Sequence, residues 1–127
     1  MGVAIVISAC SRLVLGGAAV HVVGLALAAS PAAAATVAGG TSHTLVVRTT
    51  DGTAWAWGVN SDGQLGDNTT TQRKTPIQVT GVTGVVAVAA GAKHSLALTS
   101  GGVLWAWGDN YYGQIGNGND TDQKLPG

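Results

Sequence analysis

The amino-acid sequence predicts an all-β repeat protein built from short antiparallel strands, and three observations carry this prediction. First, the chain repeats itself: His43 and His94 lie 51 residues apart, and Trp57 and Trp107 lie 50 residues apart. Second, large and small residues alternate around each tryptophan with the two-residue period of a strand. Third, Asp-Gly and Gly-Gly separate these segments, as turns separate the strands of a hairpin. Such self-similarity is typical of architectures in which one unit cannot bury its own apolar face.

The first repeat, predicted over residues 37–87, shows the expected elements in order. Asp51-Gly52 predicts a hairpin turn between two apolar runs. After this turn, Trp55 and Trp57 project to one face of a strand and the neighbouring alanines project to the other. Pro76 opens an edge strand, because an edge position need not donate every ladder hydrogen bond. The predicted strands of this repeat cover residues 37–38, 44–48, 53–58 and 76–80.

The second repeat, predicted over residues 88–127, is a shorter copy of the first. The run Val85–Ala90 is small and apolar, which favours an innermost strand buried on both faces. Strands at 94–99 and 103–108 follow, with a Gly-Gly turn between them. Pro126 aligns with Pro76, so the sequence stops where an outer strand would begin. We therefore expect an amino-terminal part of a longer reading frame, with a ring of several copies as the alternative, and we expect the uncovered apolar runs to promote association.

The repeated residues carry a family resemblance. Both copies read Gly-x-x-His-[Ser/Thr]-Leu and then Trp-Ala-Trp-Gly-x-Asn-x-x-Gly-Gln-[Leu/Ile]-Gly. This ordered motif resembles the regulator of chromosome condensation repeat from residue 37 to the carboxyl terminus. The resemblance implies β-propeller blades, usually seven of four strands each, of which this chain holds about two, the second incomplete. The positions expected to maintain the repeat are His43, Trp55, Trp57, Gly58, Gly63, Gly66, His94, Trp105, Trp107, Gly108, Gly113 and Gly116.

Residues 1–35 have the composition of a secretory signal. Arg12 precedes an apolar run over 13–29, and small residues follow this run up to Thr36. A basic residue, an apolar core and small residues before a break are the parts of a signal peptide. We therefore expect a helical segment that is cleaved between Ala29 and Thr36, and hence a secreted or cell-surface protein. A retained membrane anchor is the alternative, since the run approaches the ~20 residues that span a bilayer.

Composition and motifs point away from catalysis, cofactors and metals. Charged residues make up 9% of the chain and six basic side chains balance six acidic ones, so we expect no nucleic-acid partner. The single cysteine, Cys10, excludes an intrachain disulfide and a thiolate zinc site. His43 and His94 recur at equivalent positions, which favours turn histidines bonded to neighbouring backbone over general bases. The segment Asp120-Thr-Asp122 lacks the ligand spacing and closing glutamate of a calcium loop.

The predicted function is that of a non-catalytic extracellular protein-binding or scaffold module with an unidentified protein partner. The family resemblance implies two alternatives: guanine-nucleotide exchange on a small GTPase, and inhibition of a secreted enzyme such as a β-lactamase. Tight inhibitors usually carry aromatic anchors, whereas the turns before the histidines offer Thr41-Ser42 and Ala92-Lys93. No cofactor is expected, and membrane contact is expected only if the first segment is retained. The candidate contact residues lie at two loop tips: Asn60, Ser61, Asp62, Asn110, Tyr111 and Tyr112.

Overall fold

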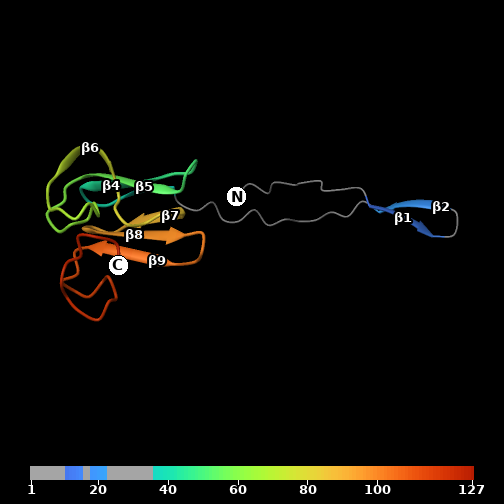
Figure 1. Cartoon of the computed structure of the whole chain (residues 1–127). Coiled ribbons are helices and arrows are strands. Elements are labelled where there is room, and N and C mark those ends of the chain that lie inside the picture. The colour runs from blue at the N-terminus through green and yellow to red at the C-terminus, as the bar shows by residue number, and fades with distance from the viewer. Residues whose placement is uncertain (1–10, 16–17, 23–35) are drawn as a thin grey trace. The chain divides into compact units, whose positions relative to one another are not determined.

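The computed structural model describes residues 11–15, 18–22 and 36–127, and the regular elements in these ranges are strands (Figure 1). The chain divides into two compact units, residues 1–33 and 34–127. The second unit contains two antiparallel sheets, which we call blade 1 and blade 2. The prediction of an all-β fold is thus confirmed for the described part of the chain.

In the first unit, β1 (Ser11–Leu15) pairs antiparallel with β2 (Ala18–Val22). This pair replaces the predicted helix over these ten residues. Three of the ten are valines, whose branched Cβ favours extended backbone. The rest of the predicted signal segment lies outside the described residues, and its cleavage stays a prediction. In the described ranges, no helix combines the length and the apolar character needed to cross a bilayer.

Blade 1 is a four-stranded meander in the order β3 (Val37–Gly39), β4 (His43–Arg48), β5 (Thr53–Gly58) and β6 (Arg73–Gln78). The predicted turn at Asp51-Gly52 is confirmed, and Gly52 adopts a positive φ of 67° there. β6 is an edge strand, as Pro76 predicted, but it begins earlier. The reason is that Arg73 pairs with Gly58 across an irregularity in the register.

Blade 2 contains β7 (Val85–Ala90), β8 (His94–Thr99) and β9 (Leu104–Gly108). Its outer position is taken by the last residues of the chain. Gln123 forms a bridge with Gly108, as Arg73 does with Gly58 in blade 1. The amide of Gly127 donates to the Ala106 carbonyl at 3.2 Å, in the place where Ile77 pairs with Ala56. The predicted repeat boundary at 87/88 falls inside β7, which belongs entirely to the second sheet.

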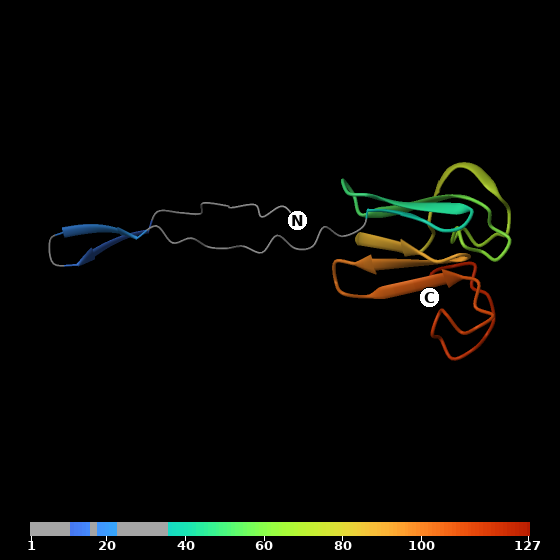
Figure 2. The ribbon, with the colours of Figure 1, turned by 180° about the vertical axis from the view of Figure 1, so that it is seen from behind.

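The core lies between the two blades, which stack against each other in both views (Figures 1 and 2). β7 was expected to be buried on both faces, but Val86 is 40% exposed because blade 1 covers only the face that carries Val85 and Val88. The small alanines of β5 are fully buried, as is the large Trp107 of β9. The Trp107 ring lies so close to Gly66, in the loop after β5, that a Cβ on this glycine would strike the indole nitrogen. The core cluster comprises Leu45, Val47, Ala54, Ala56, Leu65, Val79, Val82, Val85, Val88, Ala97 and Trp107.

Candidate protein-interaction surface

Two long loops, residues 59–72 and 109–122, lie at the same end of the two blades, opposite the hairpin turns (Figures 1 and 2). Each loop is held by one asparagine. The Asn60 side-chain oxygen accepts from the Leu65 amide at 2.9 Å, and its Nδ2 donates to the Thr69 carbonyl at 2.9 Å. The Asn110 oxygen accepts from the Ile115 amide at 3.0 Å, and its Nδ2 donates to the Asn119 carbonyl at 2.8 Å. The two loops therefore share one internal scaffold.

Asn60 and Asn110, named among the candidate contact residues, do not lie on the surface. Both side chains are 0% exposed, because their amide groups satisfy backbone donors and acceptors inside the loops. An asparagine after Trp-Gly looks the same in sequence whether it faces solvent or folds back into its loop. The contact prediction therefore stays with their neighbours: Ser61, Asp62, Tyr111 and Tyr112.

The start of each loop needs a glycine for two reasons. Gly58 and Gly108 have φ values of 112° and 102°, which L-residues rarely adopt. A Cβ at either position would also collide with the carbonyl oxygen of Ser42 or Lys93 in the neighbouring turn. The backbone bonds from Val59 to Ser42 and from Asp109 to Lys93 then tie each loop to the turn before its histidine.

The loop of blade 1 is further braced by an ion pair. Both Nε and Nη2 of Arg73 donate to one carboxylate oxygen of Asp67, at 3.0 and 2.8 Å. Partial burial alone would raise the pKa of Asp67, but hydrogen bonds from Thr69 and Arg73 outweigh this effect and lower the pKa. Asp67 therefore stays ionised and holds the loop base in place.

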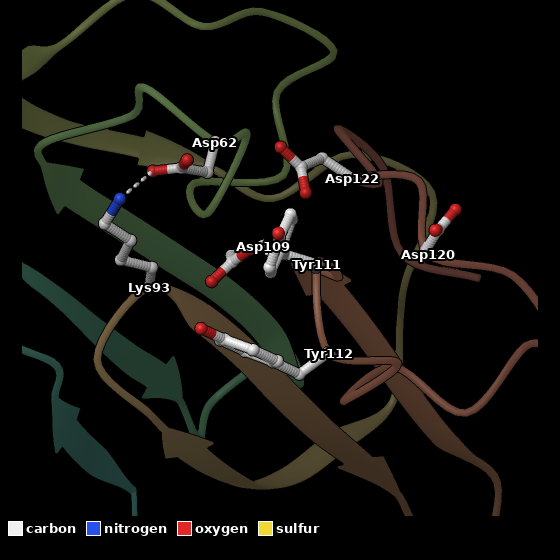
Figure 3. Close-up of a pocket in the computed structure, with 7 residues that line it drawn as sticks. All are labelled: Asp62, Lys93, Asp109, Tyr111, Tyr112, Asp120 and Asp122. Atoms are coloured by element: carbon white, nitrogen blue, oxygen red, sulfur yellow. Dashed lines mark hydrogen bonds and ion pairs between the residues drawn. The ribbon is translucent and has the colours of Figure 1, made fainter.

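An open hollow of about 470 Å³ lies between the tips of the two loops (Figure 3). Four aspartates and a single lysine contribute charge to it, so its lining is acidic. Lys93 Nζ lies 3.5 Å from the Asp62 carboxylate, while Asp122 accepts a bond from the Asn110 amide at 2.8 Å. The hollow is lined by Asp62, Lys93, Asp109, Tyr111, Tyr112, Asp120 and Asp122.

Tyr111 and Tyr112 stand at the tip of the second loop, as predicted. Their side chains are 72% and 86% exposed, and their rings pack edge to face with centroids 4.8 Å apart. The Tyr111 amide donates to Asp109 and the Tyr112 amide donates to Gln114, so the backbone beneath the rings is pinned. Exposed aromatic rings on an ordered loop are a typical feature of protein contact surfaces.

A second polar group lies buried between the blades. His43 Nε2 is 3.0 Å from the Ser95 hydroxyl, which donates to the Gln64 carbonyl at 2.7 Å. The indole nitrogen of Trp107 donates to the same carbonyl at 2.9 Å. The ring of His43 therefore bonds to a side chain of the other blade, and not to neighbouring backbone as predicted. Sequence reasoning missed this link because its members lie 31 to 52 residues apart.

The pairing of His43 with Ser95 has the distance of a nucleophile and its base, but its surroundings do not suit catalysis. The two residues are 3% and 0% exposed, so a substrate has no path to the hydroxyl. His43 Nδ1 is buried without a hydrogen-bond partner, so the ring has no group that orients it. Burial, together with the nearby His94, lowers the pKa of His43. These features describe a neutral histidine that links two blades.

The oxygen-rich segment around Asp120–Asp122, which superficially suggests a calcium loop, is held by local hydrogen bonds. The side-chain oxygens of Asn117 and Asn119 accept from loop amides, and Asp122 accepts from Asn110. In the described residues, no group of three or more histidine, cysteine or acidic side chains is arranged to hold a metal ion.

Stacked antiparallel sheets related by an internal repeat, with loops gathered at one end, define a protein built from propeller-type blades. Models of the regulator of chromosome condensation (RCC1) repeat match residues 51–98 and residues 34–64 and 85–114. The chain belongs to this repeat family.

Relatives with this repeat are much longer than the chain. Protein RCC2 homolog from Danio rerio is 43% identical over 60 residues, which are 46% of this chain and 12% of the relative. The human E3 ubiquitin-protein ligase HERC2 is 44% identical over 66 residues, which are 50% of this chain and 1% of the ligase. The chain therefore spans about one eighth or less of these relatives.

Solved structures share the fold. Human WBSCR16 superposes with a TM-score of 0.59 at 32% identity, covering 68% of this chain and 23% of that one. Yeast RCC1 (Prp20), solved bound to Kap60, gives 0.59 at 29% identity, covering 71% and 21%. Prp20p from Saccharomyces cerevisiae, studied for its binding to Gsp1p and histones, gives 0.63 at 24% identity, covering 92% and 30%.

Proposed function

We propose that the chain is a non-catalytic protein-binding module that contacts its partner through the loop tips of Asp62 and of Tyr111–Tyr112. The observation that carries this proposal is the exposed tyrosine pair beside an acidic hollow. Rigid aromatic rings bury a large area at a small entropic cost, and pinned loops reduce that cost further. Family membership supports the same conclusion, because Prp20 was solved in complex with a protein partner.

The charge of the hollow specifies the chemistry of the partner. Asp109, Asp120 and Asp122 have no lysine or arginine paired with them in the described residues, whereas Asp62 faces Lys93. Lysine or arginine side chains of a partner would form ion pairs with these carboxylates and stack on the tyrosine rings. We therefore assign the surface to a basic protein segment.

Binding of short peptides to the purified chain tests this assignment. Lys/Arg-rich peptides should bind with an affinity that falls as salt rises, and Glu-rich peptides of equal length should not bind. Tyr112→Ser and Asp122→Asn should each weaken binding several-fold. Val103→Ser is the matched control, since Val103 is 52% exposed but lies at the opposite, hairpin end. Equal binding of acidic peptides, or equal loss in the control, would contradict the proposal.

Export of the module is part of the same proposal. The apolar run over 13–29 and the small residues after it support a cleaved signal and a secreted or cell-surface location. Intact-mass measurement of the secreted protein should show loss of the first ~30–35 residues, as signal-peptide cleavage requires. A chain that keeps Met1 in the membrane fraction would support the anchor instead.

A further inference from the structure

The two blades use opposite faces of the same motif to meet each other. In β4, the buried positions are His43, Leu45 and Val47, which face blade 2. In β8, the buried positions are Ser95 and Ala97, which face blade 1. Each blade therefore has one face that resembles the covered face of the other. The interface is of the head-to-tail type, in which two different surfaces meet.

The face of blade 2 that points away from blade 1 repeats the covered face of blade 1. We call it the leading face; it consists of His94, Leu96, Leu98 and Leu104, the counterparts of His43, Leu45, Val47 and Ala54. Leu98 is 38% exposed and Leu104 is 61% exposed, although their counterparts are buried. His94 lies over Gly91 as His43 lies over Gly40, since a Cβ on either glycine would strike the ring. The leading face thus keeps the local geometry of a face that is covered elsewhere.

The face of blade 1 that points away from blade 2 repeats the covered face of blade 2. We call it the trailing face; it consists of Thr44, Val46, Trp55 and Trp57, the counterparts of Ser95, Ala97, Trp105 and Trp107. The side chains of the trailing face are only partly buried, whereas Ser95, Ala97 and Trp107 are completely buried. Thr44 retains a hydroxyl at the position where Ser95 bonds to His43.

The loop acceptor that joins the blades is repeated as well. Gln64 accepts from Ser95 and Trp107 through its carbonyl while its side-chain oxygen accepts from the Asp62 amide. Gln114 makes the same local bond, because its side-chain oxygen accepts from the Tyr112 amide at 2.9 Å. Gln114 lies 50 residues after Gln64, so its carbonyl is the counterpart of the one that accepts from Ser95 and Trp107.

We propose that the leading face of one chain receives the trailing face of a second copy, in the arrangement in which blade 1 receives blade 2. His94 then faces the Thr44 hydroxyl of the second copy, and the Gln114 carbonyl accepts from Thr44 and Trp57 of that copy. The occupant is a second copy, because every copy of the chain carries both the leading face and the trailing face that fits it. The internal interface supplies the template, so no new contact type is required.

The mass of the 127-residue chain in solution provides the first test. The expected result is a mass above the 12.5 kDa of one chain that rises with concentration in sedimentation or light scattering. Leu104→Glu should leave a monomer, because a charge on the leading face cannot be buried against Trp55 and Trp57. Val46→Glu should do the same from the trailing face. Tyr112→Ser, on the loop surface, is the control that should keep the association.

Mixing the two blocked variants gives the sharper test. Leu104→Glu retains an intact trailing face and Val46→Glu retains an intact leading face, so the mixture should form a 1:1 dimer and stop there. A monomeric wild-type chain at all concentrations would overturn the proposal, as would a mixture that stays monomeric. Association that survives Leu104→Glu would also overturn it, because the apolar residues 13–29 or a face-to-face contact would then be responsible.

Folding of the variants is checked independently of association. Leu104 is 61% exposed, so Leu104→Glu should keep a cooperative melt and the emission of buried Trp107. If it does not, Leu98→Glu on the same face replaces it. Leu104→Glu should also keep peptide binding at the loop surface. Association and peptide binding therefore test separate surfaces, and either proposal can fail while the other holds.

Discussion

Blade 1 and blade 2 share the residues of the repeat motif, yet they bury different ones. Trp107 is completely buried and bonded to the Gln64 carbonyl, whereas its counterpart Trp57 is only partly buried. Conversely, His43 is 3% exposed, whereas its counterpart His94 is only partly buried. The difference arises because blade 2 stands on one face of blade 1 and covers that face alone.

This comparison teaches that position in the stack, and not the motif itself, decides what a repeat residue contributes to stability. A tryptophan of the motif stabilises the fold in proportion to the neighbour that covers it. The loop asparagines behave differently. Asn60 and Asn110 make matching hydrogen bonds inside their own loops, so their role is the same in both blades.

The largest expected difference in stability between the two blades comes from replacing the equivalent tryptophans Trp107 and Trp57. Trp107→Ala should reduce the free energy of unfolding by ~3–5 kcal/mol, because it empties a packed core site. It also removes the indole donor to the Gln64 carbonyl. Trp57→Ala should cost clearly less in the monomer, since the side chain is only partly buried. Urea denaturation of dilute protein measures both losses, and equal losses would contradict the assigned stacking.

Removing the interblade hydroxyl is expected to have a smaller effect. Ser95→Ala should cost ~1–3 kcal/mol, because the Gln64 carbonyl and the His43 ring lose a buried partner. Thr44→Ala is the matched change on the uncovered face and should stay within ~0.5 kcal/mol. The same denaturation experiment compares the two. A larger loss of stability in Thr44→Ala than in Ser95→Ala would contradict the assignment of Ser95 to the covered face.

Acid should weaken the stack through His43. Its folded pKa is lowered from 6.5, first by burial and then by the nearby His94. Below pH 6.5 the unfolded chain therefore binds a proton more readily than the folded chain, so stability falls as pH decreases toward the folded pKa. Above pH 6.5 this contribution is fully present. Thermal melts between pH 8 and about 5 should show the loss, as this linkage requires.

Matched variants identify the histidine responsible for the acid effect. His43→Asn should flatten the pH dependence of stability below pH 6.5. His94→Asn should leave most of the slope, because His43 remains buried against Ser95. A slope that disappears only with His94→Asn would contradict the assignment.

The smallest effect is expected at the loop tip. Tyr111→Ala and Tyr112→Ala should each change stability by less than ~0.5 kcal/mol, because surface residues without buried partners rarely matter more. The two residues are 72% and 86% exposed, and their rings pack edge to face. A loss comparable to that of Trp107→Ala would mean that the tyrosines belong to the core, and would remove the basis of the binding proposal.

Much of the fold could be predicted from local patterns. The 50-residue repeat, the strands around Trp55 and Trp105 and the turn at Asp51-Gly52 all follow from periodicity and turn chemistry. Tyr111 and Tyr112 follow the predicted strand 103–108, and the structure shows both exposed in the loop after it. These features depend on residues close in sequence, and therefore the sequence alone determined them.

The choice of the buried face required the tertiary structure. A period of two defines two faces of β4 and β8, but both faces carry apolar residues, so the pattern cannot say which face a neighbour covers. The contacts of Ser95 with His43 and Gln64 join different blades, and no local rule connects them. The burial of Asn60 likewise depends on the path of its whole loop. Sequence determined the repeated unit, and the stacking of one unit on the next decided which of its residues are buried.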